Sequence, residues 1–227
     1  MTMTVISDPD HPQYDQLTQV EDLDVETLWA LQAQARQKQT GLIAYAANPI
    51  SRGFLADHGF DRVGQTHVAK LNIRDFAGNP VVPVVELESD LQTELVMLLR
   101  DHHERTHRFN PPVPNVDYAQ WLFGNQAFDR AHSIVRLTKQ HVVAAILIFK
   151  VGDHYELKWT FGDDVPTLHD LWRDLLGILP VGSQLHAAFD TTDILAMSVY
   201  DMFNWHDTQP VQDMMIWRDT TNNLRII

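Results

Sequence analysis

The chain has 227 residues, of which 44% are hydrophobic, so it can bury the core of one large domain or of two smaller ones. Its 17 Lys and Arg stand against 30 Asp and Glu. The resulting net charge of −13 argues against a nucleic-acid partner, because such proteins need cations to displace phosphate counterions. The absence of Cys excludes disulfides, thiolate nucleophiles and sulfur-rich zinc sites. The sequence also lacks a run of about 18 apolar residues and a secretory signal, which predicts a cytoplasmic protein with no membrane partner.

Two helices and two strands are predicted in the first third of the chain. Apolar residues recur at helical spacing over 25–38, and Asp24 is placed to cap that helix. A short apolar strand follows, and Asn48 begins a second helix. The turn residues of 76–80 then mark a domain boundary. The elements in order are a helix at 25–38, a strand at 40–47, a helix at 48–58 and a strand at 62–73.

The longer second part predicts a mixed α/β domain whose sheet is mostly antiparallel. Three of its strands have short connections that suit an antiparallel meander. Pro166 lies in the first turn of a later helix, where its missing N–H is tolerated. The predicted elements are a strand at 81–87, helices at 91–107 and 118–128, strands at 133–138, 141–150 and 155–161, a helix at 166–179, a strand at 184–189, a helix at 194–203 and a strand at 211–217.

A strand–helix–turn unit occurs twice along the chain. At Gly59 and Asn204 we expect the helix to end in the left-handed conformation, which Gly and Asn tolerate best. The aromatic residue that follows can then fold back on the helix. The matched pairs, each 145 positions apart, are Asn48 with Asp193, Leu55 with Tyr200, Gly59 with Asn204, and Phe60 with Trp205.

The second of these units carries a family resemblance. Residues 193–205 fill the pattern Asn/Asp-x-x-small-x-x-x-Tyr-x-x-x-Gly/Asn-aromatic, which resembles the C-terminal strand–helix–turn of the GCN5-related N-acetyltransferases (GNATs). The order of elements in 77–227 is also similar to the GNAT topology. The resemblance implies a GNAT-like acyl-CoA N-acyltransferase fold, mixed α/β with flanking helices, complete in 77–227.

The same resemblance gives residues 1–76 the role of a partial, structural copy. Asp8-Pro9-Asp10-His11 resembles the start of the loop after the fourth GNAT strand, and a full copy would need further residues before Met1. The predicted loop at 10–17 contains no glycine. This half is therefore not expected to bind CoA in the family's manner.

A modified phosphate loop is found in the second copy. In GNATs the pantetheine arm of acetyl-CoA pairs with the fourth strand, and its pyrophosphate lies on backbone N–H groups at the start of the next helix. The usual Gln/Arg-x-x-Gly-x-Gly/Ala signature corresponds here to residues 159–167, which keep one glycine, add Asp163 and Asp164, and lose a donor at Pro166. This predicts a poor phosphate cradle. The cofactor-binding candidates that the resemblance implies are Thr160, Phe161, Gly162, Thr167 and Asp193.

Two catalytic candidates follow from the resemblance and from strand alternation. Tyr200 matches the family tyrosine that protonates the departing CoA thiolate, and its alternative role is that of a partly buried aromatic. Alternation in 155–159 puts Glu156 and Lys158 on one face and the aromatic residues on the other. Glu156 could then accept the proton of an amine, or belong to a solvated polar face. Asp193 is favoured as a helix N-cap over a cofactor contact.

A zinc-hydrolase pattern is present but disfavoured. His103-Glu104-Arg105-Thr106-His107 fits H-E-x-x-H, in which two histidines on one helical face bind zinc and the glutamate activates water. The charged Arg105 between the ligands is more typical of a solvent-facing helix end, so we expect no metal. The six tryptophans are expected to anchor the core or a domain interface; they are Trp29, Trp121, Trp159, Trp172, Trp205 and Trp217.

The leading hypothesis from the sequence is a cytoplasmic GNAT-like enzyme that transfers an acetyl group from acetyl-CoA to a small amine, with a homodimer as a further expectation. The main alternative is a catalytically inactive GNAT-like binding or interaction protein, which the altered loop at 162–167 favours. A zinc hydrolase that uses His103, Glu104 and His107 is the remote alternative.

Overall fold

The computed structural model describes residues 5–9 and 11–219. These residues form two units that are each built from separate stretches of the chain. The first unit takes the described residues up to Thr66 together with 107–116 and those from Pro210 onward, and the second takes 67–106 and 117–209. No helix within 5–9 and 11–219 combines the length and the apolar content needed to cross a bilayer.

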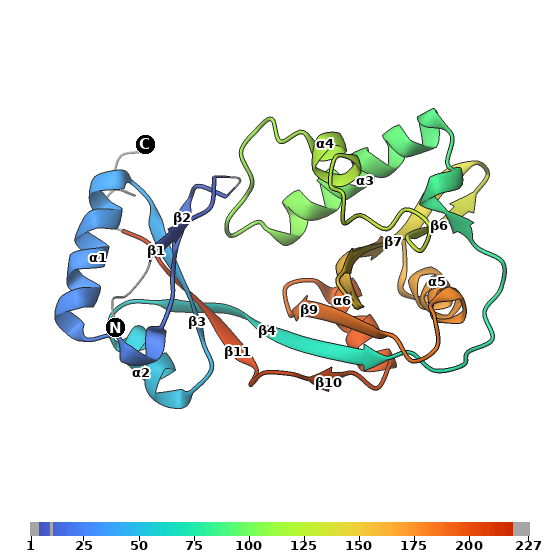
Figure 1. The fold of residues 1–227 in the computed structure, drawn as a ribbon. Helices are drawn as coiled ribbons and strands as arrows, with labels where there is room; N and C mark the ends of the chain where they lie inside the picture. Colours follow the sequence, from blue (N-terminus) through green and yellow to red (C-terminus); the bar gives the residue numbers. More distant parts are fainter. Residues whose placement is uncertain (1–4, 10, 220–227) are drawn as a thin grey trace. The chain divides into compact units, whose positions relative to one another are not determined.

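The first unit is a sheet in which the last strand of the chain lies in the middle. The strand order is β1-β2-β3-β11-β4, with β2 parallel to β3 and β11 antiparallel to both of its neighbours. Figure 1 shows helices α1 and α2 beside these strands. The elements are β1 (Val5–Ser7), β2 (Tyr14–Leu17), η1 (Val20–Asp22), α1 (Val25–Lys38), β3 (Gly41–Ala46), α2 (Pro49–Asp57), the first part of β4 (Asp61–Asn72) and β11 (Gln212–Trp217).

Local signals fix the helix ends of this unit. The Asp24 carboxylate accepts a hydrogen bond from the Thr27 N–H at 2.7 Å and caps α1 as expected, and Asn48 caps α2 in the same way. Gly59 follows α2 with a φ of 84°, the left-handed conformation predicted for it. Leu55 and Phe60 are both buried in the core of the unit, so the aromatic does fold back on the helix.

The predicted loop at 10–17 was wrong, because it contains the buried strand β2; Asp10 lies outside the described residues. Tyr14 and Leu17 are both buried. Asp15 between them is buried too. Burial alone would raise the pKa of its carboxyl, but hydrogen bonds from Ser7 Oγ and Lys38 Nζ outweigh that effect and hold the pKa below its usual value. These two partners let a charged residue occupy an inner strand.

A second buried carboxylate, Asp213, lies in the central strand β11. Its oxygens accept hydrogen bonds or ion pairs from Arg52 and Arg62 at 2.8 and 2.9 Å and from Gln65 Nε2 at 2.9 Å. Burial would raise the pKa of Asp213, but these partners outweigh burial and lower it. The three donors come from α2 and β4, so one carboxylate ties β11 to both elements.

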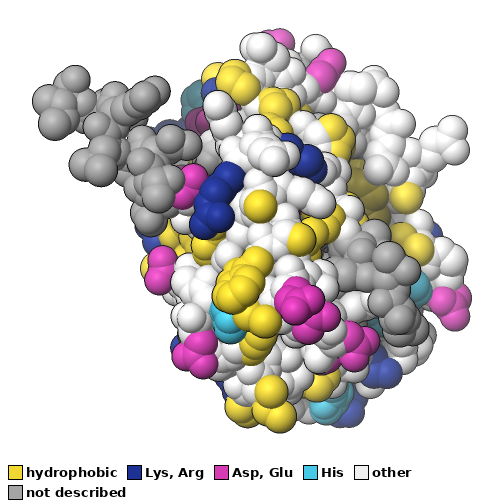
Figure 2. Space-filling model, turned by 90° about the vertical axis from the view of Figure 1, so that its left-hand side faces the viewer, with side chains coloured by type: hydrophobic (Ala, Val, Ile, Leu, Met, Phe, Trp, Pro, Cys, Tyr) yellow, Lys and Arg dark blue, Asp and Glu magenta, His cyan; other side chains and the backbone are white. Residues whose placement is uncertain are grey.

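The surface near α1 and α2 mixes side chains of every kind. Figure 2 shows this side, where hydrophobic side chains are scattered among acidic and basic ones instead of forming one continuous patch. Trp29 on α1 is 59% exposed, so the expectation that it anchors a core was wrong. It falls on the outer side of α1, whose buried residues are Leu28, Gln32 and Ala35.

The second unit is a mostly antiparallel sheet covered by helices on both faces (Figure 1). Strands β5 to β8 are antiparallel neighbours, and β8 then pairs in parallel with β9. The remaining part of β4 pairs with β10 and lies beside β9. The elements are β5 (Val82–Pro83), η2 (Val84–Glu86), α3 (Ser89–Thr106), α4 (Tyr118–Phe123), β6 (Ile134–Thr138), β7 (His141–Val151), β8 (His154–Gly162), α5 (Val165–Ile178), β9 (Gln184–Asp190), α6 (Ile194–Met202) and β10 (His206–Asp207).

Alternation along β7 separates the two faces of this sheet. Ile146 and Ile148 belong to the large core formed with α5 and α6, which includes the fully buried Trp172. Phe149 points the other way and contacts Trp159, which in turn contacts Trp121 of α4. Helices α5 and α6 therefore cover one face, and α4 covers the other.

Two predicted elements are shorter in the structure. The strand expected at 81–87 is limited to β5, after which the chain turns into the short helix η2. Pro83 is the last residue of β5, and proline has no N–H to extend a strand ladder. The helix expected at 118–128 ends at Phe123, because Gly124 follows and Asn125 Oδ1 accepts the Ala127 N–H in a local turn.

The left-handed conformation predicted for Asn204 was also wrong, since its φ is not positive. Helix α6 ends instead at Phe203, which has extended backbone with φ of −114° and ψ of 158°. A tight turn follows, in which the Trp205 N–H donates to the Phe203 carbonyl at 2.9 Å. Phe203 and Trp205 both pack on Trp172, with ring centroids 5.9 and 6.0 Å from it.

Candidate functional site

The most distinctive feature of the second unit is an opening between β8 and β9. These parallel strands pair only at Tyr155 with Leu185 and at Glu156 with His186. Strand β8 continues for six more residues to Gly162, with no further described pairing to β9. The backbone edge of β8 facing β9 is thus left open beyond Glu156, and an extended ligand can pair with such an edge as an added strand.

A β-bulge accompanies the opening. The register with β7 pairs Leu147 with Trp159 but Ile148 with Leu157, so Lys158 is an extra residue in β8. Leu157 consequently belongs to the core with α5, whereas Trp159 packs on the opposite face. The prediction that the aromatic residues of 155–159 share one face was wrong for Trp159, because the bulge reverses the alternation.

The start of α5 does not fit a pyrophosphate. The Asp164 carboxylate caps the helix by accepting the Thr167 N–H at 2.7 Å, and this hydrogen bond lowers the pKa of Asp164 below its usual value. The Asp163 N–H donates to the Val143 carbonyl at 2.9 Å, and Pro166 has no N–H. An incoming phosphate group would therefore meet an ionised carboxylate and few available donors.

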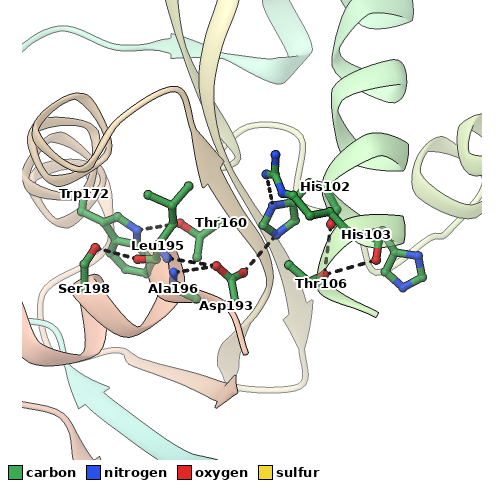
Figure 3. A network of polar contacts seen from close by, with 10 residues as sticks. His102, His103, Thr106, Thr160, Trp172, Asp193, Leu195, Ala196 and Ser198 are labelled. Atoms are coloured by element: carbon green, nitrogen blue, oxygen red, sulfur yellow. Dashed lines mark hydrogen bonds and ion pairs between the residues drawn. The ribbon is translucent and has the colours of Figure 1, made fainter. Parts of the chain in front are cut away.

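Other predicted cofactor-binding residues have structural partners of their own. Thr160 Oγ1 accepts a hydrogen bond from Trp172 Nε1 at 2.8 Å in the core, away from the open edge (Figure 3). Gly162 is closely packed, because a Cβ at this position would lie 3.1 Å from the Ala144 Cβ on β7. Neither residue is placed here by the needs of a ligand.

Asp193 and Phe161 both contact His102, which was not among the site residues predicted from the sequence. Asp193 caps α6 by accepting the Leu195 and Ala196 N–H groups, both at 3.1 Å. Its second oxygen lies 3.1 Å from His102 Nε2, as Figure 3 shows. The His102 ring also stacks on Phe161, with centroids 5.2 Å apart.

This contact connects the C-terminal ends of the two separated strands. Phe161 is near the end of β8, and Asp193 follows the end of β9 by three residues. His102 of α3 is buried and touches both. Its place in the chain offers a signal, because Leu95, Leu99 and His102 form one buried stripe of α3. A histidine on the buried stripe of a helix indicates that a polar partner lies inside the protein.

Tyr200 of α6 contacts residues of β4, β9 and β10. Its hydroxyl donates to Asp207 Oδ1 at 3.0 Å, and its ring packs on His67 and Phe189. Burial raises the pKa of the Tyr200 hydroxyl, and the hydrogen bond to Asp207 raises it further. The hydroxyl is therefore protonated at neutral pH, as a general acid must be.

Glu156 is held in an ion pair. Its carboxylate lies 2.7 Å from Lys158 Nζ and 3.7 Å from His154 Nε2. The hydrogen bond from Lys158 lowers the pKa of Glu156 below its usual value. Glu156 is therefore ionised but only weakly basic, and the structure does not bring it together with Tyr200 through any described contact.

The zinc-hydrolase pattern falls at a helix end. Helix α3 stops at Thr106, so His107 directly follows its last residue. His103 is buried against the α4 aromatics, with its Nδ1 3.1 Å from the Tyr118 hydroxyl and its ring 5.1 Å from that of Trp121. This packing gives His103 a structural role.

Comparisons with known proteins identify the fold. No known protein-family model matches the chain, and no curated protein does so by sequence. Among solved structures, a GCN5-related N-acetyltransferase from Sphaerobacter thermophilus has a TM-score of 0.64 at 12% identity, over 94% of this chain and 75% of that one. A functionally unknown conserved protein from Staphylococcus epidermidis has a TM-score of 0.57 at 8% identity, over 92% and 85%.

A third similar structure is a GNAT-family acetyltransferase from Colwellia psychrerythraea. Its TM-score is 0.52 at 9% identity, over 91% of this chain and 78% of that one. These likenesses agree with the mixed α/β architecture of the sheet and its flanking helices. The chain therefore has the fold of the GCN5-related N-acetyltransferases.

Proposed function

We propose that this protein transfers an acetyl group from acetyl-CoA to a small amine. The observation that carries the proposal is the opening between β8 and β9 in a GNAT fold. The open edge of β8 offers backbone partners to the pantetheine arm, and bound acetyl-CoA would supply an activated acyl group. Tyr200, which keeps its proton at neutral pH, is the proposed general acid, and the ionised Glu156 is the weaker candidate base.

The two residues would have to change partners to take these roles. The Tyr200 hydroxyl is bonded to Asp207 and the Glu156 carboxylate to Lys158. Proton transfer requires contact with the reacting group at hydrogen-bond distance, directly or through one water. The proposal therefore includes a rearrangement of both side chains when substrates bind.

The capped α5 helix implies weak binding of acetyl-CoA. Because Asp164 takes the place that a phosphate occupies at other helix starts, we expect the pantetheine arm to provide most of the affinity. Replacing Asp164 with Ser keeps an N-capping oxygen but removes the negative charge. Asp164→Ser should therefore bind acetyl-CoA at least about tenfold more tightly than the wild type does.

Isothermal titration with acetyl-CoA up to about 1 mM tests this proposal on the wild type, on Asp164→Ser and on Asp153→Ser. The last variant is the control, since it removes an exposed carboxylate from the turn between β7 and β8. Tighter binding by Asp164→Ser alone supports the proposal, as does acetylation of amines by that variant. Absence of any binding by all three proteins would refute acetyl transfer.

A second candidate function is a non-catalytic GNAT-fold binding protein. The Asp164 cap favours it, as does the buried contact of His102 with Asp193 and Phe161 at the ends of the separated strands. In that case acetyl-CoA should fail to protect the protein, whereas a ligand at 100 times its Kd stabilises a fold by about 2.7 kcal/mol. Thermal unfolding with and without acetyl-CoA separates the two candidates.

The proposal extends to the origin of the two parts of the chain, the oligomeric state, the compartment and the partners. We propose that 1–76 derives from a partial GNAT-like copy with a structural role and that 77–227 is the complete copy. We also propose a cytoplasmic homodimer that acts on small molecules, without nucleic-acid or membrane partners. Light scattering of the purified protein tests the dimer, and a monomer at all concentrations would refute it.

A further inference from the structure

A cavity of ≈ 250 Å³ lies in the second unit, apart from the opening between β8 and β9. Its inner wall is apolar, with Leu71, Ile73 and Leu176 buried and Phe203 partly buried beside them. At about 30 Å³ for each water-sized volume, it can hold a body of about eight heavy atoms. A cavity of this size and lining suits a short alkyl chain or a single ring.

Two basic residue types lie at the rim of the cavity, the cationic Arg74 and the imidazole of His206. Arg74 and His206 both line it and are exposed, and no Asp or Glu is part of the lining. Within the part of the chain that the structure describes, neither side chain has an ion pair or hydrogen bond. The Asp207 carboxylate does not pair with Arg74, because it faces Tyr200 and His67.

In the described part of the structure, Arg74 stays without an acidic partner in a chain whose net charge is −13. Acidic residues are plentiful, yet none approaches Arg74 within ion-pair distance among the described residues. A guanidinium at the mouth of an apolar cavity can form two parallel hydrogen bonds to a carboxylate. The body of the same ligand would then be removed from water by the inner wall.

We propose that this cavity binds a monocarboxylic acid with a small apolar body, the carboxylate lying on Arg74 and the body between Leu71 and Phe203. His206 on β10 also lines this cavity. The inference is independent of acetyl transfer, because it uses none of the residues of the open β8 edge. It assigns the protein a second ligand class.

Octanoate, octanol and octylamine test the inference by isothermal titration, since each has eight carbons in an unbranched chain and they differ in charge. Octanoate should bind once per chain with a Kd below about 1 mM, and octylamine should bind at least tenfold more weakly. Arg74→Gln should weaken octanoate at least tenfold and leave octanol unchanged. Arg173→Gln is the matched control, because it removes an exposed arginine of α5 that pairs with Asp170.

A third variant reports on the cavity itself. Asn204 is an exposed residue of the rim, and Asn204→Trp should block entry and abolish octanoate binding while leaving the urea unfolding midpoint unchanged. Equal binding of octanoate and octylamine would overturn the inference, as would full octanoate affinity in Arg74→Gln. Binding that survives Asn204→Trp in a folded protein would place the ligand elsewhere and overturn it as well.

Discussion

Replacing Asp193 tests how strongly the ends of β8 and β9 are held together. Its carboxylate accepts the Leu195 and Ala196 N–H groups and contacts the buried His102. Asp193→Ala removes an N-cap, which costs about 1 kcal/mol, and leaves a buried histidine N–H unsatisfied, which costs about 1–3 kcal/mol. The free energy of unfolding should therefore fall by about 2–4 kcal/mol.

Asp193→Ser separates the two contributions, because Ser can still cap α6 but is too short to keep the contact with His102. It should lose only the histidine part, about 1–3 kcal/mol. Urea unfolding followed by circular dichroism measures both variants. In a His102→Phe background, the change to Ser should have little effect, since the partner is already gone. If Asp193→Ser is as stable as the wild type, the contact with His102 contributes nothing and the reasoning is refuted.

Three further predictions concern other carboxylate and hydroxyl groups. Asp213→Asn should reduce stability by about 1–2 kcal/mol at pH 7, because bonds to charged groups such as Arg52 weaken. The folded-state pKa of Asp213 is lowered, so this difference should be present above about pH 4 and vanish as the pH falls through that pKa; a gap independent of pH in urea titrations contradicts it. Thr160→Val should cost about 1–3 kcal/mol by leaving Trp172 Nε1 without its acceptor, whereas Thr160→Ser should be nearly neutral in thermal unfolding. Tyr200→Phe should lower any acetyl-transfer rate by about 10²–10⁴-fold without unfolding the protein, and an unchanged rate would exclude the tyrosine as general acid.

Elements with strong local signals were predicted well from the sequence. The helix expected at 25–38 matches α1, because Asp24 caps its start and apolar spacing defines its buried side. The three strands of the meander agree with β6, β7 and β8 within two residues at each end. These elements depend on residues close in sequence, so the sequence alone indicates them. Strand β2 was missed because it carries the charged Asp15, whose ion-pair partner Lys38 lies 23 residues further along the chain.

Features of the candidate site depend on contacts between distant segments, so fewer of these features than of the helices and strands were predicted from the sequence. The altered loop before α5 indicated a poor phosphate cradle, and the Asp164 cap explains it in structural terms. The bulge at Lys158 was not predicted, since it arises from the register with β7. The partner of Asp193 was also missed, because His102 is 91 positions away and belongs to another element.

The position of β11 in the first unit sets the order in which that unit is completed. Strands β3 and β4 meet only through β11, which pairs with both of them and is made about 140 residues after β4. During synthesis, each of these two strands must wait with one edge unpaired until 212–217 leave the ribosome. Exposed strand edges are templates for wrong pairing, and contacts of large sequence separation form slowly. While the chain is growing, β3 and β4 therefore lack the neighbour that they share, and this sheet is exposed to wrong pairing for as long as 212–217 are missing.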